Sequence, residues 1–155
     1  MAEKGTDAPP GRSAREAAER ILARRDHGSA ELRRKLLARG FAPGAVEEAL
    51  RGLAGRGLLD DGAYAARFAR ESLARGRGPL WIQSKLRARG VAPAALSVSP
   101  DDEEESLRVL LARRRIVPHA LTDPRGRAKI LRFLKGRGYS GAALARLFGP
   151  AGEES

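Results

Sequence analysis

The side chains that could do chemistry in this sequence are mostly guanidinium and ammonium groups. Lys and Arg number 30 against 19 Asp and Glu, which gives a formal net charge of +11 at pH 7. A field of this sign attracts polyanions and acidic protein surfaces. The residue types therefore favour the binding of phosphates or carboxylates, and nucleic acid is the partner we expect, although the abundance of Arg can also follow from a GC-rich genome.

Residues that could act as nucleophiles, general bases or metal ligands form no telling arrangement in the sequence. The chain has no Cys, and His27 and His119 stand in expected turns without a Ser or acidic partner at a telling spacing. No phosphate-cradling Gly-x-x-x-x-Gly-Lys-Ser/Thr loop is present. The acidic run 101–105 stands at an expected helix start, where negative charge is favourable. We therefore expect no catalytic residue, no cofactor and no metal, and so no enzyme.

The composition indicates the elements that must carry the cations. Hydrophobic residues make up 42% of the chain and aromatic residues only 5%, and good helix formers dominate over β-branched residues. We predict an all-α fold. No apolar run approaches the ~18–20 residues of a membrane span, and the first residues lack the apolar core of a signal peptide. We therefore expect a cytoplasmic protein with no membrane partner.

Helix boundaries can be placed from capping residues, prolines and glycines. Ser13 with Glu16 forms a capping-box pattern, and Pro43 and Pro79 suit first helical positions. Ser29, Asp60, Asp61, Ser99 and Asp123 are also predicted helix caps. We expect a short helix after Pro93 and a linker over 116–122.

A repeat is the most informative feature of the sequence. When Gly40, Gly90 and Gly138 are aligned, at intervals of about 50 residues, positions of the same physical type coincide. The coinciding sets are Leu32/Ile82/Ile130, Leu36/Leu86/Leu134, Arg39/Arg89/Arg137, Phe41/Val91/Tyr139 and Val46/Leu96/Leu144. Because one such unit is too small to fold alone, neighbouring units must pack together.

The predicted architecture is an elongated array of three tandem three-helix modules. The modules cover residues 13–59, 60–99 and 100–148, between disordered tails at 1–12 and 149–155. Most of the seven aromatic side chains fall on or beside apolar faces, which favours core packing over stacking on bases. Trp81 is the exception to watch, because Pro79, Leu80 and Ile82 crowd apolar groups around it.

The middle helix of each module carries cations at matching positions. Recurrence favours a cationic stripe for phosphates or acidic side chains over a merely solvated surface, although Arg39, Arg89 and Arg137 also suit the negative end of a helix dipole. The densest run of cations in the sequence is 113–115. The candidate binding residues are Arg33, Arg34, Lys35, Arg39, Lys85, Arg87, Arg89, Arg113, Arg114, Arg115, Arg132, Lys135 and Arg137.

Three segments resemble the RecX family. They are residues 29–41 (SAELRRKLLARGF), residues 57–68 (GLLDDGAYAARF) followed by 76–79 and 84–86, and residues 129–140 (KILRFLKGRGYS). The resemblance spans about residues 13–148 in the right order. It identifies a family signature of Leu32, Leu36, Gly40, Phe41, Leu58, Asp60, Asp61, Tyr64 and Phe68. The segments 93–98 and 116–122 depart from the family pattern.

The resemblance implies a regulator of the RecA recombinase that acts without chemistry of its own. RecX proteins are modular helical proteins that lie in the groove of the RecA–DNA filament and limit its activity in recombination and repair. We therefore expect a monomer that binds the RecA filament and single- or double-stranded DNA. A sequence-specific repressor and a nucleoid-coating protein remain open. The absence of Asn and the single Gln83 disfavour direct readout of adenine.

Overall fold

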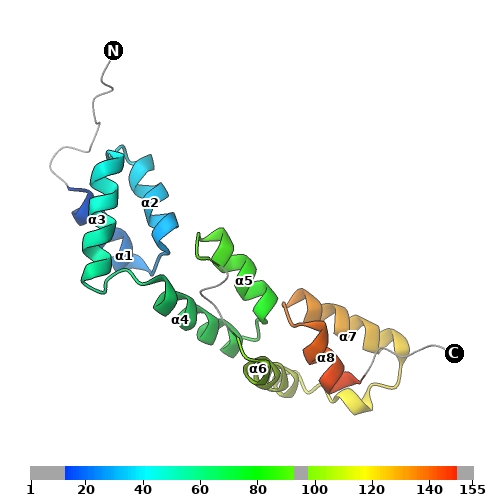
Figure 1. Ribbon diagram of the computed structural model, residues 1–155. Helices are drawn as coiled ribbons and strands as arrows, with labels where there is room; N and C mark the ends of the chain where they lie inside the picture. Colours follow the sequence, from blue (N-terminus) through cyan, green and yellow to red (C-terminus); the bar gives the residue numbers. More distant parts are fainter. Residues whose placement is uncertain (1–12, 93–97, 150–155) are drawn as a thin grey trace. The chain divides into compact units, whose positions relative to one another are not determined.

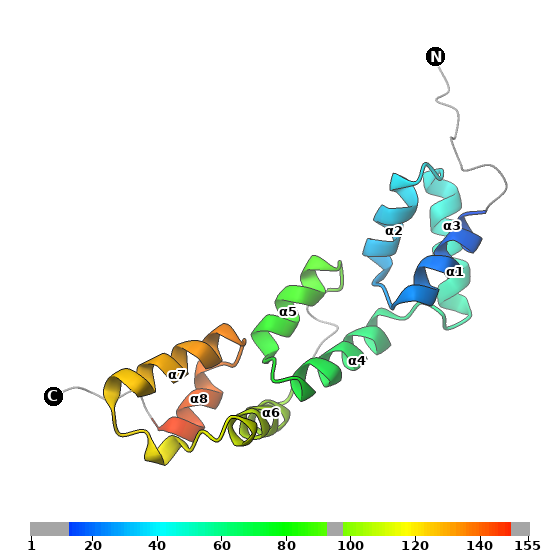
Figure 2. The ribbon, with the colours of Figure 1, turned by 180° about the vertical axis from the view of Figure 1, so that it is seen from behind.

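The structure is a computed structural model that describes residues 13–92 and 98–149 (Figures 1 and 2). Every regular element in these residues is a helix, which confirms the all-α prediction. The chain divides into two compact units, Met1–Ala65 with Leu86–Ala95, and Ala66–Lys85 with Leu96–Ser155. These units differ from the three predicted modules, whose boundaries stay a prediction.

The first unit has a core of small and aliphatic side chains. Helices α1 (Ala14–Arg24), α2 (Ser29–Ala38) and α3 (Pro43–Gly55) pack against one another and lie together in both ribbon views (Figures 1 and 2). Their buried stripes meet in one cluster, to which Ala18, Leu32, Leu36, Val46 and Leu53 each contribute a side chain with no exposed surface. The apolar spacing read from the sequence is therefore the core face of these helices.

The second unit has its own core, around α6 (Pro100–Arg113), α7 (Pro124–Gly136) and α8 (Gly141–Phe148). Leu107 and Leu134 have no exposed surface, and Leu144, Phe148 and Tyr139 are also buried there. Helices α4 (Asp61–Ala74) and α5 (Pro79–Ala88) each contribute residues to both units.

The middle helices α2, α5 and α7 end in the same way. Gly40, Gly90 and Gly138 have φ of 88°, 78° and 96°, a conformation that glycine adopts without steric cost. The N–H of the next residue donates to the carbonyl five residues earlier, as in Phe41 to Leu36 at 3.3 Å, which is the Schellman pattern. The hydrophobic residue after each glycine is buried, so the aligned repeat is a repeat of helix endings.

Most predicted caps are confirmed. Ser13, Ser99 and Asp123 accept hydrogen bonds from the first turns of α1, α6 and α7, and Asp60 accepts from the N–H of Ala63 at 3.0 Å. The prediction that Ser29 caps α2 is wrong, since Gly28 is the N-cap and makes no side-chain cap.

Two further segments differ from or escape the predictions. The expected linker 116–122 contains a short 3-10 helix, η2 (Pro118–Ala120). The short helix expected after Pro93 falls largely on 93–97, outside the described residues, as do the tail 1–12 and most of the tail 149–155.

Candidate functional site

The predicted cations of α2 do not share one environment. Arg33 is held by Glu47, with its Nε 2.5 Å from a carboxylate oxygen, and this hydrogen bond lowers the pKa of Glu47 below its ordinary value. Arg34 and Arg39 are exposed, and their side chains make no hydrogen bond or ion pair with any described residue. Lys35 instead joins a network with the end of α1.

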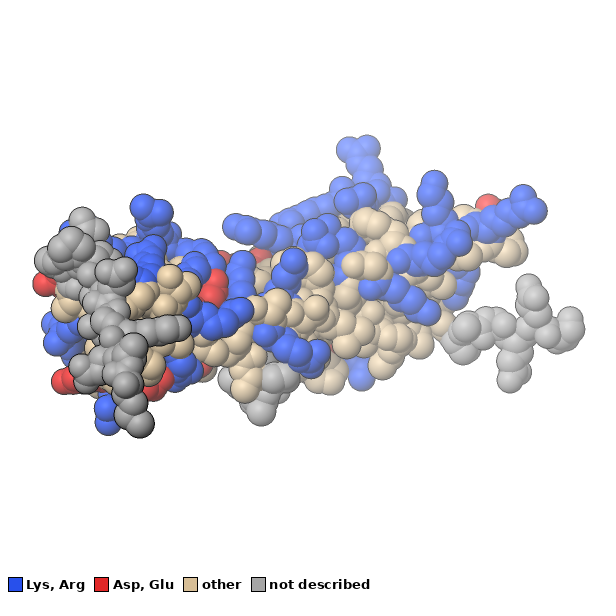
Figure 3. Space-filling view, turned by 90° about the horizontal axis from the view of Figure 1, so that it is seen from above, with Lys and Arg blue, Asp and Glu red and all other residues tan. Residues whose placement is uncertain are grey.

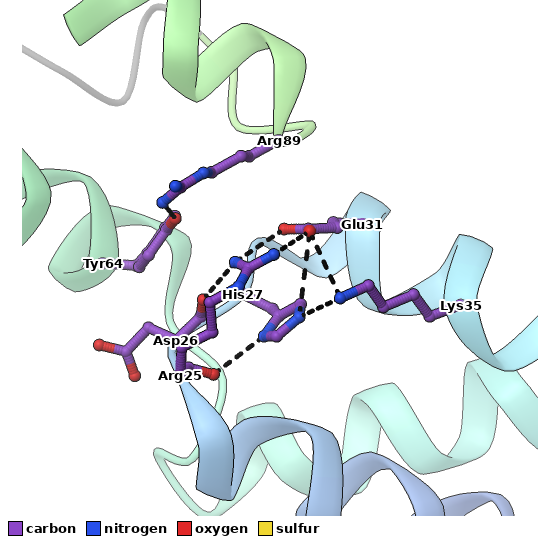
Figure 4. Close-up of polar contacts among 7 residues, drawn as sticks. All are labelled: Arg25, Asp26, His27, Glu31, Lys35, Tyr64 and Arg89. Atoms are coloured by element: carbon purple, nitrogen blue, oxygen red, sulfur yellow. Dashed lines mark hydrogen bonds and ion pairs between the residues drawn. The ribbon is translucent and has the colours of Figure 1, made fainter.

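That network centres on Glu31, a carboxylate that is 9% exposed (Figure 4). Arg25 donates to it at 2.5 Å, and the ammonium of Lys35 lies 3.7 Å from it. Burial alone would raise the pKa of Glu31, but the hydrogen bond from Arg25 and the neighbouring positive charges outweigh burial and hold the pKa below its usual range. Glu31 therefore stays ionised and fixes both cations.

His27 completes the network as a neutral, buried imidazole. Its Nδ1 lies 2.9 Å from the carbonyl oxygen of Arg25, which can only accept, so Nδ1 carries the proton. Nε2 then accepts from the ammonium of Lys35 at 2.7 Å. Burial, together with the positive charges of Arg25 and Lys35, lowers the pKa of His27.

A concavity of about 700 Å³ lies beside this network, between α1 and α2. We call it the α1–α2 pocket. Its lining consists of Arg20, Ile21, Arg24, Arg25, His27, Lys35, Ala38 and Arg39. Five of these eight side chains are cations, and two of them, Lys35 and Arg39, belong to the candidates predicted from the sequence.

The sequence-based candidates omitted Arg20, Arg24 and Arg25, because these arginines do not recur from module to module. A usable signal was present in the first expected helix, where Arg20 and Arg24 stand four residues apart. This spacing places both side chains on the same helix face.

The cations of α5 contact aromatic groups. Arg89 donates to the hydroxyl of Tyr64 at 2.8 Å, and the ammonium of Lys85 lies 5.6 Å from the centre of the Trp81 ring. Trp81 also stacks on Phe68, with ring centres 6.1 Å apart, and has the guanidinium of Arg77 at 4.8 Å. Half-buried Trp81 is thus already in contact with both an aromatic ring and cations. Arg87 is exposed.

Several candidates of the second unit hold the fold together. Arg137 donates to the backbone carbonyls of Gly76 and Arg75, both at 2.8 Å, and Arg113 donates to the carbonyl of Ala74 at 3.0 Å. Burial lowers the pKa of Arg137, and the nearby charge of Arg77 adds to the effect. These two arginines satisfy carbonyls at the end of α4, which are left without helical partners.

The remaining candidates of the second unit are more open to solvent. The guanidinium of Arg114 lies over the ring of Phe133, at 4.5 Å from its centre. Arg115, Arg132 and Lys135 are exposed and make no side-chain hydrogen bond or ion pair with a described residue.

The signature residues serve mainly structural roles. Leu32, Leu36, Phe41 and Tyr64 are buried, whereas Leu58 is 52% exposed. The carboxylate of Asp61 accepts from the backbone N–H of Ser29 at 2.8 Å and from its hydroxyl at 2.6 Å. Asp61 was predicted to cap its own helix, and its carboxylate instead holds the start of α2.

Metal and membrane sites receive no support from the described part of the chain. Residues 13–92 and 98–149 contain no group of three or more His, Asp or Glu side chains placed to hold a metal ion. None of their helices combines the length and the apolar character that crossing a lipid bilayer requires.

Comparisons with known proteins place the chain among relatives of one name. The model of the RecX first three-helix domain matches residues 14–53, and that of the RecX second three-helix domain matches residues 60–96. The regulatory protein RecX of Halorhodospira halophila is 41% identical over 129 residues, which cover 81% of this chain and 80% of that protein. The regulatory protein RecX of Chromohalobacter salexigens is 42% identical, covering 81% and 84%.

Solved structures agree on the fold. The crystal structure of RecX from Lactobacillus salivarius superposes with a TM-score of 0.72 at 20% identity and covers 86% of this chain and 91% of that one. A crystal structure of a regulatory protein RecX gives a TM-score of 0.69 at 22% identity, covering 86% and 70%.

Proposed function

Because the chain belongs to the RecX family, we propose that it binds the nucleoprotein filament of the RecA recombinase on DNA and restrains its activity without catalysing a reaction. The observation that carries the proposal is the similarity to regulatory proteins named RecX over about four-fifths of the chain. We expect it to act as a monomer in the cytoplasm.

The charge of the surface supports this proposal. Figure 3 shows Lys and Arg side chains projecting over much of the face in view, with few Asp and Glu among them. A RecA filament contains both polyanionic DNA and repeated protein subunits, so a basic surface gains from counterion release on binding. Electrostatic attraction of this kind is independent of DNA sequence.

The geometry divides the candidate residues into two groups. Arg89, Arg113 and Arg137 make hydrogen bonds within the protein, so their replacement would disturb the fold as well as any interface. The exposed candidates whose side chains make no hydrogen bond or ion pair with a described residue and do not lie over an aromatic ring are the better choice for filament contacts. They are Arg34, Arg39, Arg87, Arg115, Arg132 and Lys135.

The test is RecA-dependent ATP hydrolysis on single-stranded DNA, titrated with the full-length protein. We expect inhibition. Inhibition far below one protein per RecA subunit would indicate capping of filament ends, whereas inhibition only near saturation would indicate occupancy along the filament. Unchanged hydrolysis at saturating protein would contradict the proposal.

A nucleoid-coating or sequence-specific DNA-binding protein is the second candidate, favoured by the net charge of +11. A coating protein would bind bare strands as well as RecA-coated ones, which a pull-down on both separates. A sequence-specific protein would prefer a selected duplex over random ones by a factor of about 10³ or more.

A further inference from the structure

We propose that the α1–α2 pocket binds a phosphate group, supplied either by the backbone of a single nucleic-acid strand or by a free phosphate compound. This goes beyond filament docking, because it assigns a ligand to residues of the first helix that carry no repeat signal. Phosphate binding is measured without RecA. The pocket proposal can therefore fail while the proposed function stands, and the proposed function can fail while the pocket still binds phosphate.

The charge of the pocket is largely uncompensated. Five cations line it, and Glu31 is the carboxylate in contact with two of them, Arg25 and Lys35. The side chains of Arg20, Arg24 and Arg39 make no ion pair or hydrogen bond with any described residue. Repulsion between them is relieved when an anion enters, and a concave wall concentrates the field that draws the anion in.

Three other arginines of the same unit are paired with carboxylates, unlike those of the pocket. Arg15 lies 3.4 Å and Arg56 3.8 Å from the same carboxylate oxygen of Glu19. Arg33 is paired with Glu47. Arg15, Arg33 and Arg56 are thus matched with carboxylates, whereas three of the pocket's arginines are left open to an external anion.

The pocket's other two cations are already ordered. Glu31 fixes the guanidinium of Arg25 at 2.5 Å, and neutral His27 fixes the ammonium of Lys35 at 2.7 Å (Figure 4). Lys35 is thereby held at the pocket wall by one hydrogen bond and by its ion pair with Glu31. Binding then costs less side-chain entropy than it would on a surface where every cation is free.

Helix-end stabilisation explains only part of this arrangement. Arg24 is the last residue of α1 and Arg39 follows the last residue of α2, where a cation favours the negative end of the helix dipole. Arg20 stands one turn before Arg24, away from the helix end, and lines the same cavity. Its position adds charge to the pocket without a capping role.

The lining favours a phosphate over other ligands. Among the described residues, no Phe, Tyr or Trp lines the pocket, and the His27 ring is buried, so the pocket offers no open platform for stacking a base. Its apolar lining consists of Ile21 and Ala38. Guanidinium groups match phosphate oxygens in a forked, two-bond geometry. A volume of about 700 Å³ accommodates a group of nucleotide size.

The test uses the full chain with Arg24→Ala and Arg39→Ala together, and the double variant Arg15→Ala/Arg56→Ala as the control. Both variants remove two positive charges from the first unit. Binding of a fluorescent oligothymidylate is measured by anisotropy at several salt concentrations. We expect the pocket variant to bind about 10-fold more weakly. The slope of log affinity against log salt concentration should fall by about 1, since each phosphate contact with a single strand contributes ~0.7 to that slope. The control should stay within about twofold.

Competition identifies the source of the phosphate. In one outcome, pyrophosphate displaces the oligothymidylate from the unmodified protein and leaves the residual binding of the pocket variant unchanged. This result would show that a free phosphate compound suffices as the ligand. Failure of pyrophosphate to compete, with the variant still impaired, would indicate that the pocket needs a strand. Both results support the proposal.

Three results would overturn it: equal binding by the pocket variant and the unmodified protein, equal losses in the pocket and control variants, or stronger displacement by polyglutamate than by oligothymidylate of equal charge. The last would indicate an acidic protein segment as the ligand. Thermal unfolding by circular dichroism checks that both variants fold, which we expect because none of the replaced side chains is buried.

Discussion

A side-chain carboxylate that holds the start of a distant helix occurs in each unit. In the first unit, Asp61 accepts from the N–H and the hydroxyl of Ser29. In the second, Glu103 accepts from the N–H of Ser140 at 2.6 Å and from its hydroxyl at 3.0 Å. The first N–H groups of a helix lack helical partners, so each carboxylate satisfies a donor and favours the helix dipole.

We predict that Glu103→Ala lowers the free energy of unfolding by about 1–3 kcal/mol, because it leaves the N–H of Ser140 without its acceptor in a part-buried site. Glu105→Ala, in the same helix but exposed, should change stability by less than about 0.5 kcal/mol. Urea denaturation followed by circular dichroism measures both. Equal losses in the two variants would contradict this role of Glu103.

Buried His27 predicts a specific dependence of stability on pH. Its pKa in the folded protein lies below the ordinary 6.5, because burial and the charges of Arg25 and Lys35 disfavour the imidazolium, although Glu31 favours it. The unfolded chain therefore takes up a proton first as the pH falls through about 6.5, and stability is lost below that pH. Above it, His27 contributes no pH dependence.

The melting temperature measured between pH 7.5 and 5.5 should thus decrease below about 6.5 in the unmodified protein. His27→Gln removes the titrating group, so its melting temperature should change less over the same range, even if it starts lower. His119→Gln, at an exposed site, should retain the full decrease. A pH profile of His27→Gln that parallels the unmodified protein would refute the assignment.

At the scale of single residues, the sequence predicted which residues form hydrogen bonds better than it predicted their partners. Asp60 and Asp61 were both expected to cap α4, and only Asp60 does so, since the carboxylate of Asp61 is taken by Ser29. Local spacing identifies a residue that can accept a hydrogen bond. It does not identify the donor when that donor is 32 residues away and brought close by tertiary packing.

Helix ends meet closely in each unit, at sites where glycine is required. In the second unit, the N–H of Gly78 donates to the carbonyl of Arg137 at 2.8 Å, and that of Leu80 to Gly138 at 3.0 Å. The backbone N–H groups at the start of α5 thus donate to carbonyls at the end of α7, and both sets of groups lack partners within their own helices. In the first unit, a Cβ on Gly90 would lie 2.6 Å from that of Ala30, at the start of α2.

We predict that Gly78→Ala destabilises the protein by about 1–3 kcal/mol, because the new Cβ would lie 2.4 Å from backbone atoms of Gly138 and Tyr139. Gly52→Ala is the matched control. It lies in α3 with nothing within 4 Å of the new Cβ, so it should stabilise the helix by about 0.5–1 kcal/mol.

Chemical denaturation, followed by circular dichroism and by the fluorescence of the single Trp81, measures both glycine variants. Trp81 adjoins the junction, since a Cβ on Gly138 would lie 2.5 Å from it. Stability of Gly78→Ala equal to that of the unmodified protein would contradict the close packing.

At the scale of elements, helix starts and stops were predictable because their signals are local. A capping serine, a proline at a first position and a glycine with positive φ act within a few residues of the boundary. The junctions were not predictable, although Gly90 and Gly138 both stood out in the aligned repeat. A glycine that permits close approach looks the same in sequence as one that only ends a helix.

At the scale of the whole molecule, the repeat predicted which positions are equivalent but not what surrounds the side chain at each of them. Arg39, Arg89 and Arg137 occupy one aligned position, yet Arg39 is exposed, Arg89 donates to a tyrosine hydroxyl and Arg137 donates to two carbonyls. The alignment predicts the position of each side chain on its helix. What it meets depends on neighbouring elements that differ from one repeat to the next.

The proposed binding to the RecA filament should therefore depend on the exposed cations of the middle helices rather than on all aligned ones. We predict that Arg34→Glu/Arg87→Glu/Arg132→Glu weakens filament binding at least 10-fold and lowers the salt slope by about 2–3, since each lost phosphate contact removes ~0.7–0.9. None of the three side chains makes a hydrogen bond or ion pair with a described residue, so the fold should be retained.

The control for this variant is the reversal of three exposed arginines outside the middle helices, Arg51→Glu, Arg70→Glu and Arg75→Glu. Both variants change the net charge equally, so long-range attraction falls equally and only local contacts differ. Cosedimentation with RecA-coated single-stranded DNA at several salt concentrations measures the affinity. If both triple variants lose the same affinity and the same salt slope, filament binding follows from net charge alone, and Arg34, Arg87 and Arg132 make no specific contacts with the filament.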